Sequence, residues 1–131
     1  ALSVLGKPKT VPLSSIRKEY VLFIGDDAFW GAEIDNQSGQ QTPLWDNPTL
    51  TAQKNRNVRF HLIALGTNTH QFALPGYGWI DPGTNVVIDE KIIGPLEKHV
   101  FVVKTKQNAN YMDMTFSSKL LGMKGDLNIT P

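Results

Sequence analysis

Short runs of β-branched and aromatic residues, each closed by glycine, proline, asparagine or aspartate, recur along the chain. In one of them, Val58, Phe60 and Leu62 alternate with more polar neighbours, and this period of two is typical of a half-buried strand. No segment has the sustained 3.6-residue period of an amphipathic helix. About seven such runs, with turn residues every 8 to 12 positions, predict an all-β fold of the Greek-key sandwich or barrel type.

The same pattern gives the expected order of elements. We expect strands near residues 17–25, 58–63, 69–74, 85–89, 99–103, 110–116 and 124–130. Residues 28–57 carry three turn clusters, so a long, partly anchored loop is expected there. Residues 1–16 are expected to form an extended N-terminal arm or edge strand, and residues 17–131 a single domain, because 131 residues suit one hydrophobic core.

Composition excludes several classes of function. The 13 basic and 12 acidic residues give a net charge of +1 and are scattered, so nucleic acid is not an expected partner. No apolar run approaches the roughly 18 residues that a membrane span needs. The chain contains no cysteine, which removes disulfides, thiolate metal sites and cysteine nucleophiles. It begins with Ala1, and a processed, extracytoplasmic (periplasmic or secreted) protein is one expectation from that.

Four segments in order resemble the copper-bearing part of multicopper oxidase domains of the laccase and ceruloplasmin type. They are Pro48–Leu50 with Asn57–Gly66, then Thr69–Gly76, then Asp89–Val103, and finally Tyr111–Gly125. The second segment is similar to the family's His-x-Phe-His-Leu-His-Gly stretch, and the last to its His-Cys-His-x-x-x-His-x-x-x-Gly-Met stretch. The resemblance implies a cupredoxin-like Greek-key β-sandwich or barrel of about seven or eight strands.

The resemblance also shows which copper ligands are missing. Counted back from Gly122-Met123, Asp113 stands where the family has its copper-binding cysteine, and Ser118 stands where it has the second type 1 histidine. His70 and Met123 are the type 1 ligands that remain. Further non-ligands at trinuclear-cluster positions are Ala73, Pro75, Met112 and Met114. Blue copper needs two histidines and a thiolate, so electron transfer of that kind is not expected.

Two alternatives remain open for the ligand position. His70, Asp113 and Met123 supply an imidazole, a carboxylate and a thioether, which can hold copper(II) or zinc at a non-blue site or in a copper carrier. In the other alternative no cofactor binds: Met123 packs in the core, His70 makes local hydrogen bonds, and Asp113 pairs with a turn amide or a lysine.

The expected role is that of a structural or interaction module in a multicopper-oxidase-like system, with no catalytic site of its own. Its expected partners are other cupredoxin-like domains or further copies of the chain. The loop aromatics Trp30, Trp45, Tyr77 and Trp79 either form a binding patch or plug the ends of the sandwich. His61 and His99 are expected on polar faces, where no nucleophile or orienting carboxylate makes either one a catalytic base.

Overall fold

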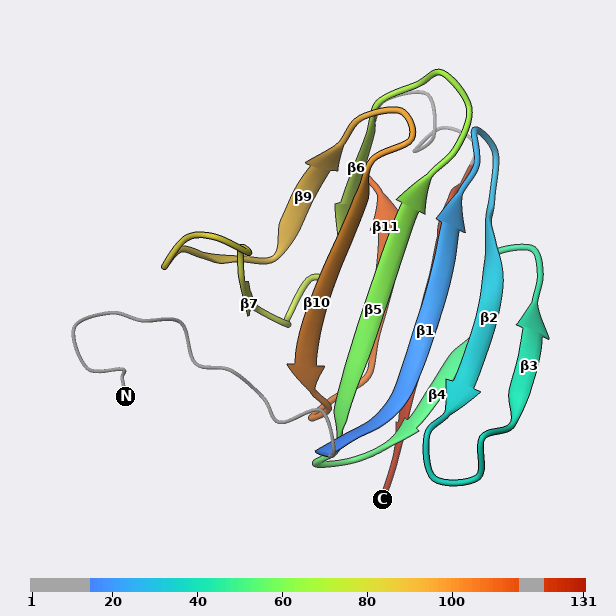
Figure 1. Ribbon diagram of the computed structural model, residues 1–131, viewed down its shortest axis with the longest axis vertical. Coiled ribbons are helices and arrows are strands. Elements are labelled where there is room, and N and C mark those ends of the chain that lie inside the picture. Colours follow the sequence, from blue (N-terminus) through green and yellow to red (C-terminus); the bar gives the residue numbers. More distant parts are fainter. Residues whose placement is uncertain (1–14, 116–121) are drawn as a thin grey trace.

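The computed structural model describes residues 15–115 and 122–131 and consists of two packed β-sheets (Figure 1). The first sheet has the spatial order β10 (Lys98–Lys104), β5 (Asn57–Ala64), β1 (Ile16–Ile24), β2 (Phe29–Asp35) and β3 (Gln41–Leu44). The second has the order β4 (Leu50–Gln53), β12 (Lys124–Thr130), β11 (Ala109–Asp113), β6 (His70–Ala73) and β9 (Glu90–Ile93). A short hairpin, β7 (Trp79–Ile80) with β8 (Val87–Ile88), projects beside them.

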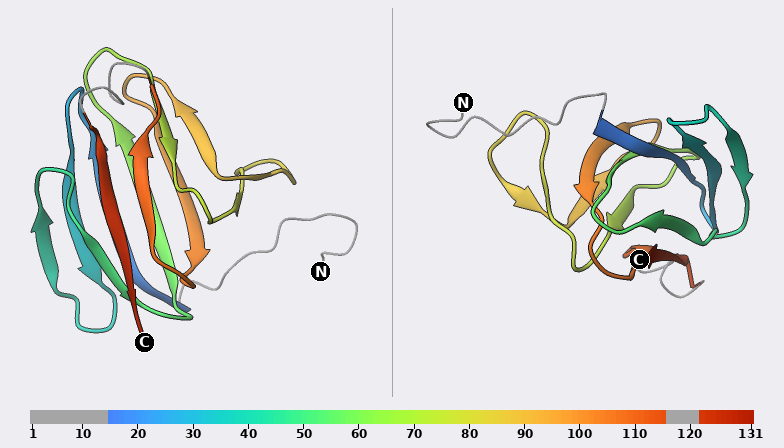
Figure 2. Two further views of the ribbon diagram at one scale, coloured as in Figure 1. Left: turned by 180° about the vertical axis from the view of Figure 1, so that it is seen from behind. Right: turned by 90° about the horizontal axis from the view of Figure 1, so that it is seen from below.

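Most neighbouring strands are antiparallel, with two parallel pairs, β1 with β5 and β4 with β12. The chain crosses from the first sheet to the second between β3 and β4, and Figure 2 shows β12 and β11 behind the strands seen in Figure 1. The strand order is not sequential within either sheet, as a Greek-key sandwich requires. The predicted all-β sandwich is confirmed.

Aromatic rings fill the space between the sheets. The Phe72 ring of β6 lies at the centre, with the centroids of five other rings 6.0 to 6.5 Å away. Phe60 of β5 stacks on Phe101 of β10 at 5.0 Å, and both alternate along their strands with half-buried residues. This packing fixes the inward face of β6, the strand that begins with His70.

The sequence predictions agree with most of the regular strands, do not include β7 or β9, and are wrong over one longer region. The expected strands at 17–25, 58–63 and 124–130 correspond closely to β1, β5 and β12. The prediction of a long loop over 28–57 is wrong, because this stretch forms β2, β3 and β4. Its turn residues are real, but they separate short strands: β2 is held by seven residue pairs with β1, and β3 lies at the sheet edge, where Pro43 is tolerated.

Two other expectations fall on residues outside the description. The arm expected at 1–16 lies there except for Ser15 and Ile16, and so does Ser118, which the resemblance places at a histidine position. The division into an arm and a single domain therefore remains a prediction. Within the described ranges, no helix is long and apolar enough to cross a bilayer.

Candidate functional site

Three neighbouring strands of the second sheet bring the predicted site residues to one end of the sandwich. His70 begins β6, Asp113 ends β11, and Met123 directly precedes β12. The antiparallel pairing of β11 with β6 places Asp113 opposite Phe72, so the carboxylate points into the sandwich beside the imidazole. The Asp113 amide donates to Met123 O at 3.1 Å. All three residues are buried.

Asp113 has every carboxylate oxygen engaged. Its Oδ2 lies 2.5 Å from His70 Nδ1, and its Oδ1 accepts from the backbone amides of Gln71 at 3.1 Å and Thr115 at 3.0 Å. The Thr115 hydroxyl donates to the same oxygen at 2.8 Å. Burial acts to raise the pKa of Asp113, but these hydrogen bonds together outweigh it and hold the pKa below its ordinary value. The group is therefore a buried carboxylate anion near neutral pH.

This carboxylate determines the state of His70. An ionised carboxylate only accepts hydrogen bonds, so His70 Nδ1 carries a proton and donates it to Asp113. The other ring nitrogen, Nε2, is buried and has no hydrogen-bond partner among the described residues. The nearest carboxylate oxygen, Oδ1 of Asp26 in the β1–β2 turn, is 3.7 Å away and too distant for a hydrogen bond. A carboxylate on one imidazole nitrogen and a free second nitrogen is the arrangement that orients metal-binding histidines.

The observed distance decides how a metal ion can fit. Two ligands of one tetrahedral ion, each bonded at about 2.0 to 2.2 Å, lie about 3.3 to 3.6 Å apart. His70 Nδ1 and Asp113 Oδ2 are only 2.5 Å apart, so these two atoms cannot share an ion unless their hydrogen bond opens. A blue copper centre does not fit the residues present, because the chain contains no cysteine to supply the thiolate. Nε2 is the ring nitrogen that has no hydrogen-bond partner within the described part of the chain.

Met123 belongs to the apolar core, where its side chain is 1% exposed. The backbone contact with Asp113 places it beside the pair, as the resemblance predicts. Among the described residues, no three histidine, cysteine, aspartate or glutamate side chains are grouped as a metal site. Asp26 is the neighbour that the sequence did not identify, since it comes from a turn of the opposite sheet.

The other candidate residues divide into core and surface. Tyr77 and Trp79 are buried: the Tyr77 hydroxyl donates to Gln107 O at 2.6 Å, and the Trp79 ring stacks on Phe101 with centroids 3.9 Å apart. The expected polar position of His99 is wrong: it is 7% exposed, and its Nε2 accepts from Trp79 Nε1 at 3.0 Å. Burial, followed by the nearby Lys91 charge, lowers the pKa of His99 and favours its neutral form.

Two further groups of candidate residues face outward from the sheets. Met112 and Met114 are half-buried on either side of Asp113 and share the opposite face of the strand. Trp45 is 68% exposed and stacks on Trp30 at 6.0 Å, while Trp30 packs on Phe23 at 4.5 Å. We call Phe23, Trp30 and Trp45 the aromatic ladder; it lies on the outer face of the first sheet.

No protein-family model and no curated protein matches the sequence. Solved structures do match its shape. The blue copper oxidase from Nitrosomonas europaea has a TM-score of 0.66 and 14% identity over 92% of this chain and 46% of its own length. The chain has the cupredoxin-like fold. The copper nitrite reductase from Nitrosomonas europaea gives a TM-score of 0.61 at 14% identity, over 98% of this chain and 52% of that one.

A multicopper oxidase from Campylobacter jejuni, described as a metallo-oxidase, gives a TM-score of 0.56 at 18% identity. There the match covers 63% of this chain and 20% of that one. This cupredoxin-like chain thus spans about half, or less, of the proteins that it resembles. The predicted fold type is confirmed.

Proposed function

We propose that this chain is a cupredoxin-like structural or interaction module that has no blue copper centre and acts through contacts with other domains. The observation that supports this most directly is the 2.5 Å hydrogen bond between His70 Nδ1 and Asp113 Oδ2. It joins the retained histidine to the residue at the thiolate position and occupies the space where a shared metal ion would lie. The chain itself supplies no cysteine to replace it.

The packing around the pair supports a structural role. Asp113 ties β11 to β6 through the Gln71 amide and to its own following turn through Thr115. A metal ligand would have to give up part of this set, and buried donors left without acceptors cost about 1 to 3 kcal/mol each. The pair is therefore suited to holding the start of β6 and the end of β11 in place.

The aromatic ladder is the surface best suited to a partner. Large aromatic side chains bury much area at little entropic cost and often dominate the energetics of an interface. Trp45 contributes the exposed end of the ladder, on the edge formed by β2 and β3. The occupant in this proposal is a second cupredoxin-like domain, either another copy of this chain or a domain of a larger assembly.

Copper(II) and zinc(II) titration by calorimetry, together with sedimentation velocity, tests the proposal. We expect no saturable metal binding and concentration-dependent self-association that Trp45→Ser weakens. The matched control is Ile92→Ser, which removes an equally exposed apolar side chain, 65% exposed, from β9 in the other sheet. A chain that is strictly monomeric and binds one equivalent of copper tightly would contradict the proposal.

A second candidate is a mononuclear, non-blue metal protein or copper carrier that uses His70, Asp113 and Met123. It is favoured by one observation, the buried and unpartnered His70 Nε2. In this case the imidazole supplies the metal-bound nitrogen, and Asp113 and Met123 complete the set only after local rearrangement. Binding that His70→Ala abolishes and His61→Ala leaves unchanged would support this candidate, and binding equal in both variants would exclude the site.

A further inference from the structure

The other end of the sandwich holds a pocket of about 220 Å³ between β1 and β2 of the first sheet and β4 and β12 of the second. We call it the basal pocket. Its charged and hydroxyl-bearing lining residues are Arg17, Lys18, Asp35, Thr51, Arg56 and Thr130. Figure 1 places the start of β1 and the end of β12 at this end, away from the start of β6 and the end of β11, so the pocket is separate from the His70–Asp113 pair.

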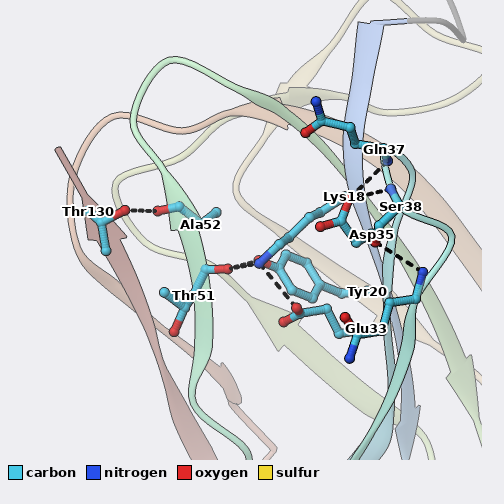
Figure 3. A network of polar contacts seen from close by, with 10 residues as sticks. Lys18, Tyr20, Glu33, Asp35, Gln37, Ser38, Thr51, Ala52 and Thr130 are labelled. Carbon is cyan, nitrogen blue, oxygen red and sulfur yellow. Dashed lines mark hydrogen bonds and ion pairs between the residues drawn. The ribbon is translucent and has the colours of Figure 1, made fainter.

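Two of the charged lining groups are already satisfied. Lys18 Nζ lies 3.1 Å from Glu33 Oε2 and donates to Thr51 O at 2.8 Å, which joins the two sheets across the pocket wall (Figure 3). Asp35 Oδ1 accepts from the Gln37 amide at 2.9 Å and the Ser38 amide at 3.3 Å. These contacts leave the lysine neutralised by Glu33 and the aspartate bound within its own turn.

The two guanidinium groups are not satisfied in this way. Among the described residues, neither Arg17 nor Arg56 has a side-chain hydrogen bond or an ion pair within 4.0 Å, although Arg17 attracts Asp35 from a longer distance. Arg56 Nε is shielded from solvent on every side, including the side of the pocket. A ligand in the pocket would therefore have to use the terminal N–H donors of the guanidinium groups.

We propose that the basal pocket binds a small oxyanion, a phosphate or a short dicarboxylate, between Arg17 and Arg56. The planar guanidinium group matches the oxygen geometry of carboxylates and phosphates, and two of them face a single lining carboxylate, that of Asp35. Thr51 and Thr130 add hydroxyl groups to the lining. A volume of about 220 Å³ is below the roughly 300 to 1,000 Å³ of sites for drug-sized ligands, so a small anion fits better than a nucleotide.

The test is a titration of the full chain with inorganic phosphate and, separately, with succinate at low ionic strength. Amide chemical shifts followed by NMR give the affinity and the location, and thermal unfolding gives a second readout because a ligand of the folded state raises Tm. Arg56→Gln and Arg17→Gln should each weaken binding at least tenfold. The tighter of the two anions identifies the chemistry of the ligand.

The matched control is Lys98→Gln, which removes the same charge at the start of β10, an exposed site remote from the pocket. Arg56→Lys keeps the charge but removes the planar fork of N–H donors, and it should also weaken binding. It keeps the test valid if Arg56→Gln fails to fold. Equal weakening by Lys98→Gln would show nonspecific charge attraction and overturn the proposal. A dissociation constant above about 1 mM for both anions would overturn it as well.

Discussion

Replacing Asp113 with alanine tests how much the buried pair contributes to stability. The change removes the acceptor of the buried His70 Nδ1 and those of the part-buried Gln71 amide and Thr115 amide and hydroxyl. Gln71 and Thr115 are half-buried, so their donors can turn to water more easily than the His70 ring, which is 1% exposed. Removing one partner of a buried, hydrogen-bonded pair usually costs about 3 to 5 kcal/mol, and we expect a loss of about 3 kcal/mol here.

Asp113→Asn separates geometry from charge. The amide oxygen can still accept from the Gln71 amide and from Thr115, and the amide nitrogen can donate to His70 Nδ1 if the imidazole proton moves to Nε2. What is lost is the charge-assisted character of the bond, so we expect a loss of about 1 to 2 kcal/mol. The shift of the proton to Nε2 should be visible in the ¹⁵N chemical shifts of the ring.

Equilibrium unfolding in urea, followed by tryptophan fluorescence, measures both variants, since the free energy of unfolding falls linearly with denaturant. A double-mutant cycle with His70→Gln isolates the pair from the other contacts of Asp113. A loss below about 1 kcal/mol for Asp113→Ala would refute the reasoning from unsatisfied donors. An equal loss in the alanine and asparagine variants would refute the tautomer argument.

Three further predictions concern the rest of the fold. The Arg59 hydrogen bond, opposed by burial and aided by other hydrogen bonds, lowers the pKa of Glu19 from 4.5 to about 2. The stability that comes from this depressed pKa is present above about pH 4.5 and is lost as the pH falls towards 2, by about 1 to 2 kcal/mol after screening. Acid titration of the Glu19→Gln variant should lack this loss. Gly31→Ala places a Cβ atom 1.8 Å from Val21 O, so it should lower stability by about 3 kcal/mol or more in thermal unfolding, and a native-like Tm would contradict the β1–β2 register. Tyr111→Phe removes the hydroxyl that donates to Pro48 O at 2.5 Å and should cost about 1 to 2 kcal/mol in urea; no loss would mean that this buried bond contributes nothing.

The sequence predicted best where one face of a strand is buried and the other is not. In β5 the alternation of Val58, Phe60 and Leu62 is reproduced by the burial pattern. It failed over residues 28–57, where β2 contains Gly31, pressed against the β1 backbone, and β3 contains a proline. In this stretch, pairing with the neighbouring strands overrides a weak local preference for the strand conformation. The local sequence does not show which strand will be the partner.

His99 shows a second limit of the same kind. The period of two along β10 placed His99 on one face of the strand together with Phe101 and Val103. It could not predict which face is buried, because Val100 and Val102 on the other face are equally apolar. The Trp79 side chain settles the matter by donating a hydrogen bond to the ring. The inward position of His99 becomes predictable only when its hydrogen-bond partner Trp79, which lies 20 positions away in the sequence, is known.

The candidate site combines both situations. Counting positions back from Gly122-Met123 selected His70, Asp113 and Met123 as candidate ligands. The strand order and register then place these three residues at one end of the second sheet. The sequence could not predict that the Asp113 carboxylate hydrogen-bonds directly to the His70 imidazole. That depends on a separation of 2.5 Å between Oδ2 and Nδ1, which is shorter than the spacing between two ligands of one metal ion. A thiolate is a weaker hydrogen-bond acceptor than a carboxylate. At the position that the resemblance assigns to a copper-binding cysteine, Asp113 can therefore hold His70 in a structural contact.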